Sequence, residues 1–173
     1  MLNHSILTKA LFCGLLALSL SAHAQYKTLD PADENDLDAP RFWNEVEVKI
    51  PTAPPSKELK PFFVSINTPL TFSIDAESIT LGADDVLRYI IVITSPTGAR
   101  QTSYEGIRCE KYEWRLYATL PSDGQWRKNP GSKWQMITSN SYNRYHAALV
   151  KDAFCENAIP RRNMKEIIQL LKP

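Results

Sequence analysis

Residues 103–120, SYEGIRCEKYEWRLYATL, hold the densest group of chemically active side chains in the sequence. A carboxylate at Glu105, a thiol at Cys109, three tyrosines, a tryptophan and two arginines fall in this one run. Such residues can build a hydrolytic site, an aromatic binding surface or the middle of a packed sheet. The elements that position them decide between these three possibilities.

The segment before this run positions its carboxylate. VLRYIIVITS (86–95) is rich in β-branched residues, which predicts a central strand, and a turn follows it. If Pro96–Ala99 form a four-residue turn, Arg88 lies diagonal to Glu105 on the same face of the sheet. Because buried charges must be paired, we predict a structural ion pair between Arg88 and Glu105. The alternative is a catalytic carboxylate held by an arginine.

The two cysteines outside the first 24 residues are Cys109 and Cys155. In an exported chain an even number of cysteines predicts a disulfide, and the spacing is not C-x-x-C. Cys109 has the same strand parity as Glu105, so a Cys109–Cys155 bridge would tie a C-terminal helical segment over that face. It would stabilise the fold by about 4 kcal/mol in the chain-entropy model. Free thiols or a redox pair are the alternative.

Export itself is predicted by residues 1–24, which have the features of a signal peptide. Lys9 precedes an apolar run over residues 10–20, and SAHA supplies small residues at the cleavage positions. We expect cleavage before Gln25 and a periplasmic product. The apolar run is shorter than the roughly 20 residues that span a bilayer, so we expect no transmembrane segment in the mature chain.

The mature chain is predicted to have two parts. Residues 25–40 are strongly acidic and poor in apolar side chains, which is typical of a disordered leader, and residues 41–173 suit a single domain. The formal net charge of the full chain is +1 at pH 7, and it becomes zero once Lys9 is removed. A neutral chain lacks the general attraction to nucleic acid that a basic one has, so we expect no nucleic-acid partner.

Sequence periodicity predicts an α+β fold with a mostly antiparallel β-meander sheet covered by C-terminal helices. Asn163, three residues before Glu166, resembles a helix capping box. The expected strands are 62–66, 70–75, 78–82, 86–95, 100–108 and 112–120, followed by two short strands near 126–128 and 133–137, and helical spacing begins near residue 143.

Several kinds of chemistry have no motif in this sequence. No phosphate-binding glycine loop and no G-x-S-x-G occur, and we expect no cofactor and no metal site. The single histidine of the mature chain, His146, is predicted to be a surface or helix-boundary residue. A pair of carboxylates could still meet in space, and Glu105, Glu113 and Asp123 are the acids to test.

Aromatic residues offer the other candidate site. Trp126 and Trp134 flank a basic loop that includes Arg127 and Lys128, which indicates a partially exposed binding patch. The alternative is that these rings belong to the core.

A long central run resembles a known family. LGADDVLRYIIVITSPTGARQTSYEGIRCEKYEWRLYAT, with Phe154–Cys155 and the closing helix, is similar to the cryptic neisserial protein-like family of Gram-negative envelope proteins. RY at 88–89 and YEGIRC at 104–109 are its most specific elements. The resemblance implies a periplasmic or membrane-attached protein without an established activity, so it supplies no catalytic residues. The resemblance also implies that members are often expected to be lipoproteins, but Phe12 precedes Cys13 here and no usable lipobox is present.

Together these features favour a soluble periplasmic, non-enzymatic module that binds an unknown envelope protein or glycan. Two alternatives stay open. One is a cell-envelope hydrolase that uses unrecognised carboxylates, and the other is a purely structural or stress-related envelope protein.

Overall fold

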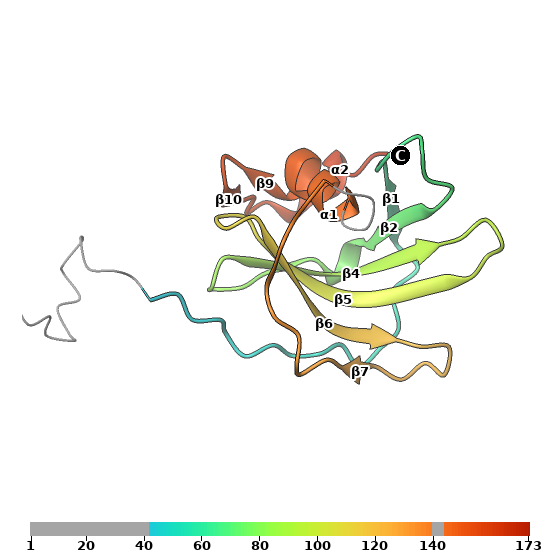
Figure 1. The fold of residues 1–173 in the computed structure, drawn as a ribbon, viewed down its shortest axis with the longest axis horizontal. Helices are drawn as coiled ribbons and strands as arrows, with labels where there is room; N and C mark the ends of the chain where they lie inside the picture. The colour runs from blue at the N-terminus through green and yellow to red at the C-terminus, as the bar shows by residue number, and fades with distance from the viewer. Residues whose placement is uncertain (1–41, 140–143) are drawn as a thin grey trace, which may run out of the picture. The chain divides into compact units, whose positions relative to one another are not determined.

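The computed structural model describes residues 42–139 and 144–173. The predicted signal peptide (1–24) and acidic leader (25–40) lie outside the described residues. The fold is an antiparallel sheet followed by two short C-terminal helices (Figure 1), which agrees with the predicted α+β class.

The sheet has eight strands, and its main path runs β1-β2-β4-β5-β6-β7. Strand β3 pairs with β4, and β8 pairs with β6. The bounds are β1 Leu59–Phe62, β2 Thr71–Asp75, β3 Thr80–Leu81, β4 Val86–Thr94, β5 Arg100–Arg108, β6 Glu113–Leu120, β7 Arg127–Lys128 and β8 Gln135–Met136. The first seven residues of β4 are all buried, as expected for a β-branched strand with neighbours on both faces.

The C-terminal part begins with α1 (Arg144–Leu149) and a π-helical turn, η2 (Val150–Phe154). A small hairpin, β9 (Cys155–Glu156) and β10 (Ile159–Pro160), leads to α2 (Met164–Leu170). Asn163 caps α2 as predicted, because its side chain accepts from the backbone N–H groups of Lys165 and Glu166. The Glu166 carboxylate, however, pairs with Arg161.

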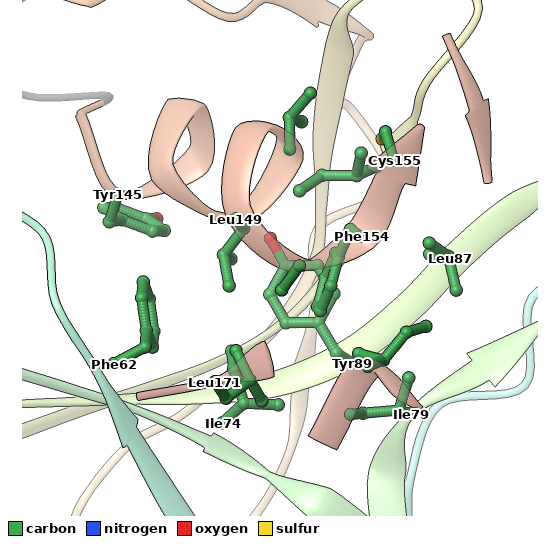
Figure 2. Packing of buried hydrophobic residues seen from close by; sticks show 14 of the residues in the cluster. Phe62, Ile74, Ile79, Leu87, Tyr89, Tyr145, Leu149, Phe154, Cys155 and Leu171 are labelled. Atoms are coloured by element: carbon green, nitrogen blue, oxygen red, sulfur yellow. The ribbon is translucent and has the colours of Figure 1, made fainter. Parts of the chain in front are cut away.

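These helical elements pack on one face of the sheet. Leu149, Phe154 and Ile167 belong to the same buried cluster as Tyr89 and Ile107 of the sheet. Figure 2 shows Tyr89 reaching from β4 toward α1, beside Leu149 and Phe154. Cys109 and Cys155 lie at disulfide-bonding distance within this cluster, with a Cα–Cα distance of 5.8 Å, as predicted.

The first strand differs from the prediction. We predicted a strand over 62–66, but β1 ends at Phe62, and residues 63–70 form the connection to β2. β1 includes Pro61, which has no N–H to donate. This is tolerated because β1 is the edge strand of the sheet, with β2 as its neighbour.

The opposite face of the sheet contacts an extended segment, residues 42–58, which we call the strap. It is the cyan segment that passes on the side of the sheet away from the helices in Figure 1. The indole N–H of Trp43 donates to the Asp84 carbonyl oxygen at 2.9 Å, and Ser56 donates to the Asp75 carboxylate from both its N–H and its hydroxyl. Side chains, rather than a strand ladder, therefore hold the strap in place.

The β4–β5 register decides which side chains share a face. Thr94 pairs with Arg100, so the turn spans Ser95–Ala99 and is one residue longer than predicted. Arg88 consequently lies opposite Gly106, and Tyr89 lies opposite Glu105. A shift of one residue moves a side chain to the other face. Arg88 and Glu105 are thus on opposite faces of the sheet.

Candidate functional site

Glu105 is the centre of a buried polar group between the sheet and α1. Its side chain accepts hydrogen bonds from the hydroxyls of Ser103 at 2.6 Å, Tyr89 at 3.1 Å and Tyr145 at 3.1 Å. Nε2 of His146 lies 2.9 Å from Oε2 and donates the fourth. We call these five residues the Glu105 cluster. Only 2% of Glu105 is exposed, so its charge is stabilised by these donors instead of by water.

The donors also set the ionisation of the cluster. Burial opposes the charge on Glu105, but His146 and the hydrogen bonds from Ser103 and Tyr145 outweigh it and lower the carboxyl pKa below 4.5. Burial and the nearby carboxylate raise the pKa of Tyr89 well above 10.0 and raise that of Tyr145 as well. The cluster therefore holds a fixed carboxylate among neutral phenols, an arrangement suited to joining α1 to the sheet.

His146 is the main correction to the predicted site. We predicted a surface or boundary position, but its exposed fraction is 0%. Its ring stacks on Trp114 with centroids 4.0 Å apart and lies 3.9 Å from the Tyr145 ring. Within residues 42–139 and 144–173, Nδ1 has no hydrogen-bond partner. Nε2 therefore makes the hydrogen bond of the ring, and it donates because the Glu105 carboxylate can only accept.

A cleft of about 590 Å³ lies beside this cluster. Tyr145 belongs to the cluster and lines the cleft, and Trp114, which stacks on His146, lines the cleft as well. The guanidinium of Arg144 donates to the Ser65 hydroxyl at 2.9 Å. The lining residues in the described part of the chain are Val64, Ser65, Asn67, Thr68, Leu70, Phe72, Ile93, Gln101, Trp114, Arg144 and Tyr145.

The strap side of the sheet has its own buried charges. Arg88 binds Asp84 through two hydrogen bonds, at 2.6 and 3.0 Å, and lies 3.5 Å from Glu45 of the strap. Glu45 also accepts from Arg115 and from the Tyr117 hydroxyl, each at 2.5 Å. We call these five residues the Glu45 cluster. The predicted Arg88–Glu105 ion pair is wrong, because each residue binds other partners on its own face.

Charge pairing shifts the pKa values of this second cluster. Burial opposes ionisation of Asp84, but the Arg88 guanidinium and the backbone N–H of Val46 outweigh it and lower its pKa below 3.8. Burial raises the pKa of Tyr117, and its hydrogen bond to Glu45 raises it further. Arg88 stays protonated, since Asp84 raises its pKa against the effect of burial.

Comparison with known proteins places the chain in a family. A sequence model of the CNP1-like family matches residues 38–172. The chain belongs to the CNP1-like family. This agrees with the predicted resemblance at the level of the family, which is itself uncharacterised. No curated protein and no solved structure matches the chain.

The predicted aromatic patch of this CNP1-like chain contacts the strap. Trp126 is half-buried and donates from its indole N–H to the Ala53 carbonyl oxygen at 2.8 Å. Trp134 is half-buried too and donates to Glu45 at 3.3 Å. Arg127 and Lys128 are exposed on β7. Both tryptophans therefore contact the strap.

The acids considered for hydrolysis lie in three different settings. Glu105 is enclosed, Glu113 pairs with Arg108 at 3.6 Å, and Asp123 lies in an exposed turn with Arg127. None of the described residues that line the cleft is acidic. Among the described residues, no group of three or more His, Cys, Asp or Glu side chains is arranged to hold a metal ion. No helix there is long and apolar enough to cross a membrane.

Sequence reasoning missed the cleft. Its polar residues come from the β1–β2 connection, from Gln101 of β5 and from Arg144, the first residue of α1. The run FVSI was interpreted as strand, and no motif marked Arg144. The available signal was NTP at 67–69, which predicts a turn and places polar side chains beside the end of β2.

Proposed function

We propose that this protein is a non-enzymatic binding module of the cell envelope, with the cleft beside α1 as its ligand site. The observation that carries the proposal is a cavity of about 590 Å³ whose lining includes Trp114, Tyr145 and Arg144. Small-molecule sites typically have this size, mainly apolar walls and a few oriented polar groups. The ligand is an envelope component that enters this cavity.

The chemistry of the cleft supports binding more than hydrolysis. A carboxylate mechanism needs acids that reach the substrate. Glu105 lies behind Tyr145 and His146 with its oxygens engaged by four donors, and the described lining of the cleft holds no acid. The tryptophan patch is a weaker candidate because Trp126 and Trp134 already contact the strap.

Blocking the cleft tests the proposal. Gln101 lines the cleft and is exposed, so Gln101→Trp should fill part of the cavity without disturbing the core. Gln125→Trp is the matched control, since Gln125 is exposed in a turn and is not among the cleft residues.

We expect native mass spectrometry, after incubation with an envelope extract, to show a bound compound on the wild-type protein and on Gln125→Trp. Gln101→Trp should lose it. Equal retention by all three proteins would place binding elsewhere. Retention by none would favour the structural or stress-related role.

The periplasmic location is a separate part of the proposal. It is supported by the signal-peptide pattern of residues 1–24 and by two cysteines at disulfide distance, which suit an oxidising compartment. Protein isolated from its native host should begin at Gln25. A retained N-terminus or a lipid on Cys13 would overturn this location.

A further inference from the structure

Arg144 differs from the other partly buried arginines of the domain. Arg88, Arg115 and Arg161 each pair with a carboxylate, at 2.5 or 2.6 Å. In the part of the chain that the structure describes, Arg144 pairs with no acidic side chain, and its side-chain hydrogen bond goes to the neutral Ser65 hydroxyl. A guanidinium has five N–H donors in a planar fork, so most of them are available to a ligand in the cleft.

The rest of the cleft is suited to a hydrocarbon chain. Phe72, Ile93 and Trp114 give it an apolar wall, and Leu70 lies at the connection between β1 and β2. Three large apolar side chains of that connection reach solvent, since Phe63 is 55%, Ile66 is 88% and Leu70 is 39% exposed. Exposed apolar side chains next to a cavity are typical of a binding site rather than of a closed surface.

The single positive charge of Arg144 determines which ligand head group the cleft can balance. One guanidinium balances one negative charge, and a carboxylate can accept two parallel N–H···O bonds from it. A doubly charged phosphate monoester would need a second cation, and the described lining of the cleft contains no lysine or second arginine. A singly charged carboxylate is therefore the better match.

We infer that the cleft binds a single-chain carboxylate amphipath of the fatty-acid class. This rests on the proposed function and names its ligand. The carboxylate binds the Arg144 guanidinium, and the hydrocarbon chain packs along Phe72, Ile93 and Trp114 toward Leu70.

Calorimetry with three ten-carbon probes tests this inference on the full mature chain. The probes share a ten-carbon chain and are decanoate, decanol and decyltrimethylammonium. The two ionic probes are kept below their micelle concentrations, and decanol is kept below its solubility limit. We expect decanoate to bind about tenfold or more tightly than decanol, because a charge-assisted hydrogen bond contributes about 1.5–3 kcal/mol. The cationic probe should bind more weakly than either.

Variants separate the contribution of the carboxylate head group to binding from that of the hydrocarbon chain. Arg144→Gln should reduce decanoate affinity to that of decanol and leave decanol binding unchanged, which also shows that the variant is folded. Arg162→Gln is the matched control, since Arg162 is exposed and pairs with Asp85 away from the cleft. Leu70→Ser should weaken both probes. If Arg144→Gln does not fold, Arg144→Lys should keep a preference for decanoate, though a smaller one.

The same measurements distinguish the carboxylate ligand from the more general proposal that the cleft is a binding site. Equal affinity for decanoate and decanol, both lost in Gln101→Trp, would overturn the carboxylate assignment and keep the cleft as a binding site. Binding of none of the probes, together with no compound retained from the envelope extract, would overturn both. Tighter binding of the cationic probe would also contradict the role of Arg144.

Discussion

On the face that packs against the helices, Glu105 is held by three hydroxyls and one imidazole, whereas beneath the strap Glu45 and Asp84 are held by guanidinium groups. The side chain of Glu105 is 3% exposed, while those of Glu45 and Arg115 are 14% and 26% exposed. Water can replace a lost partner more readily in the second setting. Equal chemical changes should therefore have unequal effects on the two faces.

Glu105→Gln should have the largest effect on stability. Four donors lose a charged acceptor in a place that water does not reach, and breaking a buried charged group of this kind costs about 3–5 kcal/mol. Urea unfolding measures the loss. Glu110→Gln is the control, because Glu110 is exposed and its ion pair is with Lys111, which is also exposed, so its change should stay within about 0.5 kcal/mol. An unchanged unfolding curve with lost ligand binding would make Glu105 a functional residue instead.

Replacing both Cys109 and Cys155 by alanine should come next, at about 2–4 kcal/mol. The bridge joins the residue after β5 to the residue after η2, so its loss frees the helical side of the sheet more than the strap side. Thermal unfolding measures the effect, and reduction of the wild-type protein should lower the melting temperature similarly. Two alkylatable thiols in the native protein would contradict the disulfide.

Gly106→Ala should affect the strap face. A Cβ at this position would lie 2.6 Å from the Tyr117 hydroxyl oxygen and 2.7 Å from its ring, so Tyr117 must move away from Glu45. Overpacking of this kind costs about 1–3 kcal/mol. Gly131→Ala is the matched control, since no atom lies within 4 Å of the added Cβ there. Combining Gly106→Ala with Tyr117→Ala should remove most of the added penalty, and full additivity would argue against the contact.

Glu45→Gln should cost less, about 1–2 kcal/mol. A hydrogen bond to a charged group contributes about 1.5–3 kcal/mol, and water can replace part of this at a partly exposed site. The amide can still accept from Tyr117 and Trp134, and Arg88 keeps Asp84. Chemical unfolding compares it with Glu47→Gln, an exposed control on the same strap. A loss as large as that of Glu105→Gln would remove the difference between the two faces.

Acid should weaken both faces gradually. The folded-state pKa values of Glu105 and Asp84 lie below the ordinary 4.5 and 3.8, so the unfolded chain binds protons first as the pH falls. Their stabilisation is complete above those ordinary values and is lost as the pH falls through the folded-state values. Each carboxyl contributes at most about 1.4 kcal/mol per pH unit. Unfolding from pH 6 to pH 3 should give a flatter profile for Glu105→Gln, and an equally steep one would show that Glu105 does not contribute.

Local signals in the sequence predicted much of the fold. The β-branched run gave β4, the turns around it gave β5 and β6, and Asn163 was correctly identified as a helix cap. The shared face of Glu105, Ile107 and Cys109 was also correct, because strand alternation requires only a regular β5. The Arg88 partner was missed because one extra residue in the Ser95–Ala99 turn changes the parity between the strands.

The site depended on contacts that no local pattern encodes. His146 contacts Glu105 across 41 positions, and Trp134 contacts Glu45 across 89. Helical spacing alone gave no reason to bury His146, because its partner, Glu105, was predicted to pair with Arg88. The cleft combines a loop, a strand end and the first residue of α1, so its lining follows from packing in three dimensions and not from periodicity.

The strap has a consequence for the order of folding. Its Glu45 contacts join residues that are 70, 72 and 89 positions apart in the chain, and those partners lie on β6 and just before β8. Long-range contacts of this kind form slowly, because a long loop must close before they can contribute. We therefore expect the strap to dock after β4, β5 and β6 have paired. The part of the domain that leaves the ribosome first is therefore among the last to reach its final position.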